Sequence, residues 1–242
     1  MDYAWFCKKH KLSNTELFSE FFDLFADTFE VKNKKIAVDK LKTIITATFK
    51  LSASQSFASM SLRQLSDETE ISMGGLYAYI KNKQQLSLFI HQFLNHHAEK
   101  VFKQIDSSLP EDSVENTLEN IIKTHVYLSE VLHPWFFFAF MESKNLDKSM
   151  KKYAIESELM MESKLVKAIE QGQELEIYSN ILSAETIAAH IKPLLHDWYL
   201  KRWKYKQRNI SVDEFCYSIM IFINRGLTSP HTLTEQDENN DE

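Results

Sequence analysis

Glycine and proline are scarce in this chain, each occurring only four times in 242 residues. Hairpins and repeated strand–turn units depend on these two residue types, so their scarcity leaves little room for a sheet. Long stretches without either residue favour helices, and the length suits one or two domains with a real hydrophobic core. The sequence therefore predicts an all-α protein.

Cysteines and long apolar runs are also few. Cys7 and Cys216 are the only cysteines and neither belongs to a CxxC pair, which excludes a disulfide framework and indicates a reducing compartment. The most apolar stretch, VLHPWFFFAFM, has 11 residues, too few to span a bilayer. The N-terminus has early acidic and aromatic residues and no apolar h-region, so we expect no signal peptide, no membrane partner and a cytoplasmic location.

Motifs for catalysis, metal binding and phosphate binding are missing as well. No GxSxG, P-loop or GxGxxG pattern occurs. His96 and His97 follow His91 by five and six residues, not by the four residues that separate the histidines of HExxH. We predict no catalytic residue, no metal and no cofactor.

Charge is unevenly distributed along the chain, whose net charge is −6. Residues 34–83 carry eight basic and four acidic side chains, a net charge of +4, which leaves −10 for the rest. A small basic domain on an acidic body is typical of a nucleic-acid-binding protein. A solvated helical surface is the alternative interpretation.

Apolar residues recur at intervals of three and four along most of the chain. This spacing predicts helices at 14–31, 36–53, 61–68, 72–80, 83–105, 111–131, 134–145, 148–171, 184–206 and 211–227. Gly172 is expected to cap the helix that ends at residue 171. The final residues are acidic and lack apolar side chains, which predicts disorder.

Two of the four glycines stand side by side in ISMGGLYAYIKNK, residues 71–83. Residues 61–80 fit two short helices with a turn between them, with Ser61 and Ser72 as N-caps. The expected inward positions are Leu62, Leu65, Ile71, Leu76 and Ile80. Glycine in the first turn of the second helix lets the backbone approach another surface closely, such as a nucleic-acid groove. The alternative is that the glycines only loosen a turn before a core helix.

The same stretch resembles the helix-turn-helix of the TetR family of bacterial transcriptional regulators. The pattern S-x-G-x-L-Y-x-Y-[apolar]-x-x-K-x-x-L is matched at Ser72, Gly74, Leu76, Tyr77, Tyr79, Ile80, Lys83 and Leu86. The resemblance covers about residues 36–90. It departs from the family at Ser56 and Glu70, where glycine is usual, and at Ser52, where phenylalanine is usual; Glu70 is expected to need a left-handed backbone.

The resemblance implies the site residues. Those assigned to DNA binding are Ser61, Leu62, Arg63, Ser72, Met73, Gly74, Gly75, Tyr77, Tyr79 and Lys83. The planar fork of Arg63 suits a base or a phosphate, and Lys83 resembles a phosphate contact. Tyr77 and Tyr79 lie about 200° apart around a helix, so we expect only one of them to face DNA.

The resemblance also implies an effector site in the C-terminal part. Its candidate lining residues are Trp135, Phe136, Phe137, Phe138, Phe140, Met141, His190 and Trp198. Ordinary core packing is the alternative for the stretch 133–143. Helices 184–206 and 211–227 are the expected dimerisation helices.

Together these features predict a three-helix helix-turn-helix domain followed by a larger helical ligand-binding and dimerisation domain. The expected ranges are 1–34 for an N-terminal extension, 35–90 for the DNA-binding domain, 91–230 for the effector and dimer domain, and 231–242 for the acidic tail. The expected function is a homodimeric, nucleoid-associated repressor that a small hydrophobic effector releases from a near-palindromic duplex operator. The alternatives are a helical lipid or small-molecule binder, a helical enzyme, and an adaptor that uses the Phe-rich first helix, none of which binds DNA.

Overall fold

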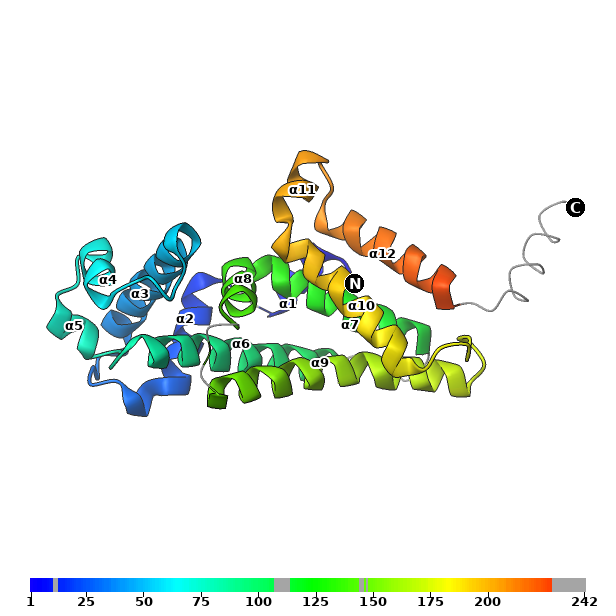
Figure 1. Cartoon of the computed structure of the whole chain (residues 1–242), viewed down its shortest axis with the longest axis horizontal. Helices are drawn as coiled ribbons and strands as arrows, with labels where there is room; N and C mark the ends of the chain where they lie inside the picture. The colour runs from blue at the N-terminus through cyan, green and yellow to red at the C-terminus, as the bar shows by residue number, and fades with distance from the viewer. Residues whose placement is uncertain (11–12, 107–113, 144–145, 147, 228–242) are drawn as a thin grey trace, which may run out of the picture. The chain divides into compact units, whose positions relative to one another are not determined.

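The computed structural model describes residues 1–10, 13–106, 114–143, 146 and 148–227 (Figure 1). These residues contain helices and no strand, which confirms the predicted all-α class. The helices are α1 Tyr3–His10, α2 Asn14–Phe25, the 3₁₀ helix η1 Ala26–Thr28, α3 Lys34–Gln55, α4 Leu62–Thr69, α5 Met73–Tyr77, α6 Lys83–Asp106, α7 Val114–Val131, α8 His133–Glu142, α9 Lys148–Glu174, α10 Ala184–Leu200, α11 Arg202–Gln207 and α12 Val212–Leu227.

Most predicted helices begin and end within a few residues of the observed ones; two predictions were wrong in detail and one helix was missed. The first predicted helix ends early, because η1 replaces the α-helix after Phe25. The range 184–206 is divided at Lys201, whose φ of −118° and ψ of 36° are not helical. α1 was not predicted, because it is short and has one buried residue, Phe6, instead of an apolar stripe. Residues 111–113, 144–145 and the acidic tail lie outside the described residues.

Packing divides the chain into two compact units. Unit 1 comprises Met1–Phe6, Val101–Glu130 and Glu156–Glu242, and unit 2 comprises Cys7–Lys100 and Val131–Ile155. The chain crosses this division four times, inside the helices α1, α6 and α9 and at the last residue of α7. The domain ranges expected from the sequence assign DNA binding, effector binding and dimerisation, which a division by packing does not test. These ranges therefore stay a prediction.

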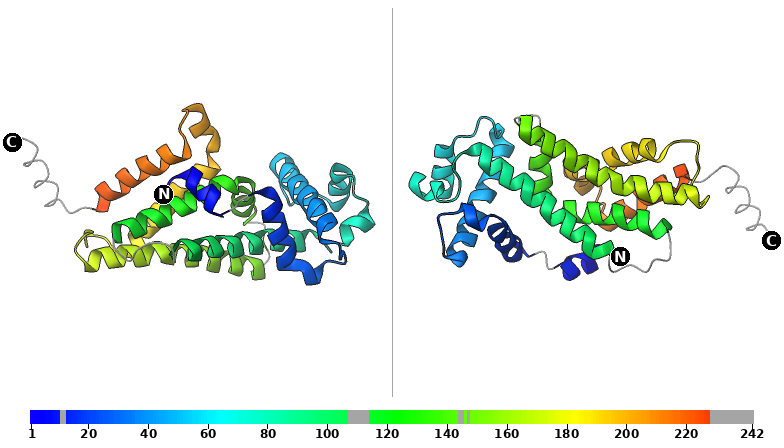
Figure 2. Two further views of the ribbon diagram at one scale, coloured as in Figure 1. Left: turned by 180° about the vertical axis from the view of Figure 1, so that it is seen from behind. Right: turned by 90° about the horizontal axis from the view of Figure 1, so that it is seen from below.

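Unit 2 has an aromatic core in which α2 packs against α3 (Figure 2). The ring of Phe25 stacks on Phe89 of α6 with centroids 4.3 Å apart. Phe21 lies 5.2 Å from Phe93 of the same helix. A capping box at Ser13 and Glu16 starts α2. The amphipathic helix that the sequence predicts is therefore confirmed, and its apolar face belongs to the core of unit 2.

Unit 1 is built around Trp198 on α10, whose side chain is fully buried. Its indole ring lies 4.8 Å from Phe215 of α12 and 5.0 Å from Tyr205 of α11. The indole N–H donates to the carboxylate of Glu130 at 3.0 Å, and Arg202 forms an ion pair with the same carboxylate. These contacts hold α10, α11 and α12 to the end of α7.

Gly172 does not cap α9, so that prediction was wrong. It lies inside the helix without a positive φ, and the left-handed residue beyond the helix is Glu176, with φ of 59°. Glycine is required for another reason: a Cβ atom at this position would come within 2.1 Å of the ring of Tyr178. The carbonyl of Gly172 also accepts the N–H groups of Ile177 and Tyr178 at 2.9 and 3.0 Å.

Candidate nucleic-acid interface

Two short helices of unit 2, α4 and α5, form the predicted helix-turn-helix. The hydroxyl of Ser61 accepts the N–H of Gln64 at 3.1 Å, and the side chain of Gln64 accepts the N–H of Ser61 in return. The hydroxyl of Ser72 accepts the N–H of Gly75 at 3.2 Å. Both predicted N-caps are confirmed, and each satisfies an amide that a helix start leaves without a partner.

The inward side of the two helices is apolar, as the sequence predicts. Leu65 and Leu76 are fully buried, and Ile71 and Ile80 are nearly so. Leu62 is half-buried at the start of α4. The turn between the helices contains Glu70 with φ of 55° and ψ of 23°, which confirms the expected left-handed backbone.

The outward side carries the side chains that a partner would meet. Arg63 and Tyr77 are exposed, Tyr77 by 49% of its surface, and Met73 is half-buried. Lys50 and Glu68 form an ion pair at 2.5 Å, whereas Arg63 has no charge partner among the described residues. The guanidinium group is therefore available to a ligand on this surface.

The two adjacent glycines differ in their surroundings. A Cβ atom on Gly75 would lie 2.9 Å from Cγ2 of Ile71, inside the turn. A Cβ atom on Gly74 would meet nothing within 4 Å, and neither glycine has a positive φ. Packing inside unit 2 therefore explains Gly75, while nothing within the described residues requires glycine at Gly74.

Two residues assigned to DNA binding make contacts inside unit 2. Tyr79 is only 5% exposed and its ring lies 5.9 Å from Phe29, so it belongs to the core, and burial raises its pKa. Of the two tyrosines, Tyr77 is therefore the exposed one, as expected if only one of them faces DNA. Lys83 donates to the carbonyls of Phe57 and Ala58 at 3.2 and 2.7 Å, so its ammonium group holds the loop between α3 and α4.

Sequence reasoning missed the polar groups that fix these helices in place. The side-chain amide of Gln64 donates to Gln55 at the end of α3 at 3.1 Å. The side chain of Asn82 accepts the N–H of Gln85 at 2.8 Å at the start of α6. The sequence carried a signal for the second contact, because Asn82 precedes Gln85 by three positions, and none for the first.

Several solved structures share this architecture, although no family model and no curated protein matches the chain. A regulatory protein of the tetR family from Rhodococcus RHA1 has a TM-score of 0.68 at 15% identity, over 78% of this chain and 97% of that one. The TetR-family regulator PfmR from Thermus thermophilus has a TM-score of 0.62 at 18% identity, over 77% and 99%. FadR from Bacillus subtilis, solved in complex with stearoyl-CoA, has a TM-score of 0.58 at 13% identity, over 76% and 98%.

The chain has the TetR-regulator fold. The resemblance noted in residues 36–90 is thus confirmed at the level of the fold. The neighbours are covered almost completely, whereas about a fifth of this chain lies outside the TetR-type fold. Ser56, at a position where that family usually has glycine, has φ of 69° and ψ of 149°. The positive φ explains why glycine is usual there.

The residues predicted to line an effector pocket are divided between the two units, and their role stays a prediction. Trp135 and Phe138 are buried in unit 2, where the ring of Trp135 packs against Phe21 at 5.8 Å and Phe93 at 4.9 Å. The other α8 residues of the set are half-buried or exposed, namely Phe136, Phe137, Phe140 and Met141. His190 is exposed and Trp198 fills the core of unit 1. Core packing therefore explains Trp135, which contacts α2, and Phe138, which contacts Phe49 and Phe57.

A buried polar cluster in unit 1 was not predicted. Lys192 is 3% exposed, and its ammonium group lies 3.1 Å from the carboxylate of Glu158 on α9. His196 lies 3.4 Å from the same oxygen atom. Burial raises the pKa of Glu158, but the hydrogen bond from His196 and the charge of Lys192 lower it to about 2. Burial, together with the charge of Lys192, holds the pKa of His125 well below its usual range.

One face of α12 in this TetR-type fold is apolar and exposed. Tyr217 and Phe222 are exposed by 70% and 67%, and Ile221 by 46%. The opposite face of the helix contains Phe215, Ile219 and similar residues that pack into unit 1. No helix of the described ranges is long and apolar enough to cross a membrane, and no group of metal-binding side chains gathers in them.

Proposed function

We propose that this chain is a DNA-binding transcriptional regulator that reads duplex DNA with α4 and α5. The observation that supports this most directly is Gly74. Gly74 lies in the first turn of α5, and neither the backbone conformation nor the packing there requires glycine. An exposed position without a side chain on the second helix of a helix-turn-helix suits close approach to a groove.

In this proposal α5 lies in the major groove and α4 crosses the backbone, which is the docking geometry of helix-turn-helix proteins. Arg63 then binds a base edge or a phosphate, Tyr77 contacts DNA, and Met73 offers an apolar contact to a thymine methyl group. Ser61 and Ser72 hold the two helix starts that face the duplex. Gly75 and Lys83 shape the turn and the neighbouring loop.

We propose that the regulator is a homodimer formed through α10 and α12. The exposed apolar face of α12, made of Tyr217, Ile221 and Phe222, supports this assignment, since large side chains gathered on one face mark an interaction site. A two-fold dimer presents two copies of α5, about 34 Å apart, to successive major grooves. The operator is therefore expected to be near-palindromic.

A small hydrophobic effector is the expected signal, and release of the operator, hence repression, is the expected response. The FadR neighbour, which was solved with stearoyl-CoA, supports a ligand with an apolar acyl chain for this fold. In unit 1, Lys192 and His125 are polar groups inside an apolar interior, which is the composition of small-molecule sites. The effector would release DNA by binding better to the conformer that fits the operator poorly.

The rival function is a helical lipid carrier, enzyme or adaptor that does not bind DNA. The fold permits it, because a fold does not fix a function. Selection of bound sequences from a random pool of duplex DNA separates the two proposals. A DNA-binding dimer enriches a motif with two half-sites about 10 base pairs apart, whereas the rival enriches no motif.

A further inference from the structure

The ammonium group of Lys192, on α10 of unit 1, lies in the interior. The side chain is 4% exposed, and the residues one turn before and after it, Ala188 and Leu195, are fully buried. Lysine is rarely buried to this degree unless its charge is paired, because the ammonium group gives up strong hydration. An ammonium group has three N–H donors, and the described residues supply one acceptor, the carboxylate of Glu158 on α9 at 3.1 Å.

The carboxylate that pairs with Lys192 stands at the edge of the interior. The side chain of Glu158 is 49% exposed, and the oxygen atom that meets Lys192 also lies 3.4 Å from Nε2 of His196. Because half of this side chain is already in water, the carboxylate can turn outward at little cost in its own hydration. A buried cation and a neighbouring imidazole nitrogen would then face a position that a second carboxylate fits.

Two further rings of unit 1 adjoin this position. The ring of His196 lies 6.3 Å from that of His125 on α7 and 5.7 Å from that of Tyr199, one turn along α10. Both rings are buried. Burial holds the pKa of His125 well below its usual range, and burial and the charge of Glu158 raise the pKa of Tyr199. Neither ring is therefore charged near neutral pH, and Lys192 stays the buried charge that an anion must match.

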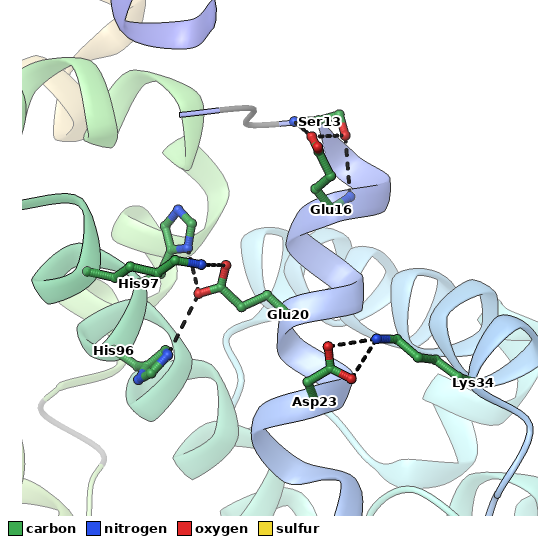
Figure 3. Close-up of polar contacts among 8 residues, drawn as sticks. Ser13, Glu16, Glu20, Asp23, Lys34, His96 and His97 are labelled. Atoms are coloured by element: carbon green, nitrogen blue, oxygen red, sulfur yellow. Dashed lines mark hydrogen bonds and ion pairs between the residues drawn. The ribbon is translucent and has the colours of Figure 1, made fainter. Parts of the chain in front are cut away.

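The polar cluster of unit 2 joins two helices without a buried lysine. Glu20 on α2 accepts a hydrogen bond from Lys100 at 2.8 Å and lies 3.1 Å from Nδ1 of His97, both on α6 (Figure 3). There Lys100 is exposed and the carboxylate is half-buried, whereas in unit 1 the cation is buried and the carboxylate is exposed. An ion pair that only joins α9 to α10 does not need its ammonium group removed from water.

We propose that Lys192 and His196 bind the head group of an effector that has an apolar body and one carboxylate, and that Glu158 occupies this position when the effector is absent. The effector carboxylate replaces that of Glu158, so the number of charges in the interior does not change. One carboxylate suits the site better than a phosphate, because Lys192 and Glu158 match one charge with one. This inference rests on the proposed function, since it names the class of effector.

The other possibility is that the pair of Lys192 and Glu158 only joins α9 to α10. Replacement of such a pair by apolar residues is often neutral or stabilising, so its presence alone does not establish a ligand site. The two possibilities differ in what happens to ligand affinity when either partner is removed. A site predicts opposite effects of the two substitutions on the affinity for a carboxylate, and a structural pair predicts none.

The test is calorimetric titration of the full chain, without DNA, with decanoate and with benzoate. Decanol and benzyl alcohol are the matched neutral probes. Lys192→Met removes the cation and keeps the length of the side chain, while Glu158→Gln removes the internal carboxylate. Lys167→Met and Glu170→Gln, both at exposed positions on α9 of the same unit, are the control variants.

The site predicts that at least one of the two carboxylates binds about tenfold or more tightly than its alcohol, as expected for hydrogen bonds to a charged group. Lys192→Met should abolish this preference. Glu158→Gln should bind the same carboxylate more tightly than the original chain, because no internal carboxylate competes. The control variants should bind as the original chain does.

Urea unfolding provides a second measurement on Glu158→Gln. Without ligand this variant should be less stable than the original chain, because a buried ammonium group is left without its partner. The carboxylate that binds should restore more stability to it than to the original chain. If Glu158→Gln does not fold, Lys192→Met still decides, because its half-exposed glutamate needs no buried partner.

Equal affinity for carboxylate and alcohol, no binding of either carboxylate, or a preference that survives Lys192→Met would each overturn the site. These titrations contain no DNA, so the outcome is separate from that of the proposed function. A chain that binds the carboxylate through Lys192 and retains no duplex would refute the regulator and leave the site standing. A chain that retains the selected duplex and binds no carboxylate would refute the site alone.

Discussion

At the scale of single residues, the two adjacent glycines differ in whether the fold requires them. Gly75 is required by the packing of Ile71, so a bulky residue there would disturb the turn as well as any interface. Gly74 faces open space, and a side chain there affects only what approaches from outside. Gly74 is therefore the position at which the DNA-binding proposal can be tested without damage to the fold.

Replacement of Gly74 by leucine should weaken duplex binding by more than about tenfold, equivalent to about 1.4 kcal/mol, because the side chain holds the backbone away from the groove. Thermal stability should stay the same or rise, since leucine favours helix more than glycine does. A mobility-shift titration and a thermal melt measure the two effects. Thr15→Leu, an exposed substitution in the first turn of α2, is the matched control. Equal affinities of both variants would contradict the role of Gly74.

Ser56 is the second residue whose conformation makes a prediction. Its φ of 69° and ψ of 149° lie close to a region that is nearly reserved for glycine and costs about 1–3 kcal/mol. Ser56→Gly should therefore raise the free energy of unfolding in urea. Ser56→Ala removes the same hydroxyl group and keeps the strain, so it should be less stable than Ser56→Gly. Equal stability of the two variants would show that the strain is absent.

At the scale of helices, the sequence predicted most elements and failed at particular places. The period of the apolar residues located α6 and α12 closely, because each buries one continuous stripe. It missed α1, which has a single buried residue, and the break at Lys201, which follows no proline or glycine. A periodic pattern detects an apolar helix face, and neither α1 nor the break at Lys201 presents one.

The candidate site was predicted in part for the same reason. Local pattern identified the caps Ser61 and Ser72, since capping depends on residues three positions apart. It could not show that Tyr79 points inward, because the partner that buries it, Phe29, is 50 residues away in the sequence. It could not show either that α2 covers Trp135.

The contact of α2 with α6 predicts a pH dependence of stability. Burial raises the pKa of Glu20, but hydrogen bonds from His97 and Lys100 lower it from 4.5 to about 2. A carboxylate with a lowered pKa stabilises the folded state above its ordinary pKa, and this contribution is lost as the pH falls from 4.5 towards 2. Glu20→Gln should therefore destabilise the protein near neutral pH, and much less as the pH approaches 2.

Urea unfolding of both proteins at about pH 7 and about pH 3 measures this difference. Asp39→Asn, which removes an exposed carboxylate from α3 of the same unit, is the control and should change stability little at either pH. An equal difference in the free energy of unfolding between the original protein and Glu20→Gln at both pH values would mean that the partners of the Glu20 carboxylate do not stabilise its charged form.

At the scale of the whole molecule, the account depends on association of two chains. Phe222→Lys places a charge in the exposed apolar face of α12 and should convert dimers into monomers, because a charge inside an interface loses its hydration. Sedimentation or light scattering measures the mass. Leu159→Lys on α9, where the leucine is 57% exposed, is the matched control and should remain dimeric. A dimer that survives Phe222→Lys would place the interface elsewhere.

The most direct measurement of the central claim is a titration of the selected duplex by fluorescence anisotropy at several salt concentrations. Phosphate contacts predict that the logarithm of the binding constant falls linearly with the logarithm of the salt concentration. Arg63→Ala should weaken binding and, if Arg63 contacts a phosphate, reduce this slope by about one. A DNA-reading dimer should saturate at two chains per duplex. Failure of the protein to retain any duplex at the lowest salt concentration would contradict the proposal that α4 and α5 read DNA.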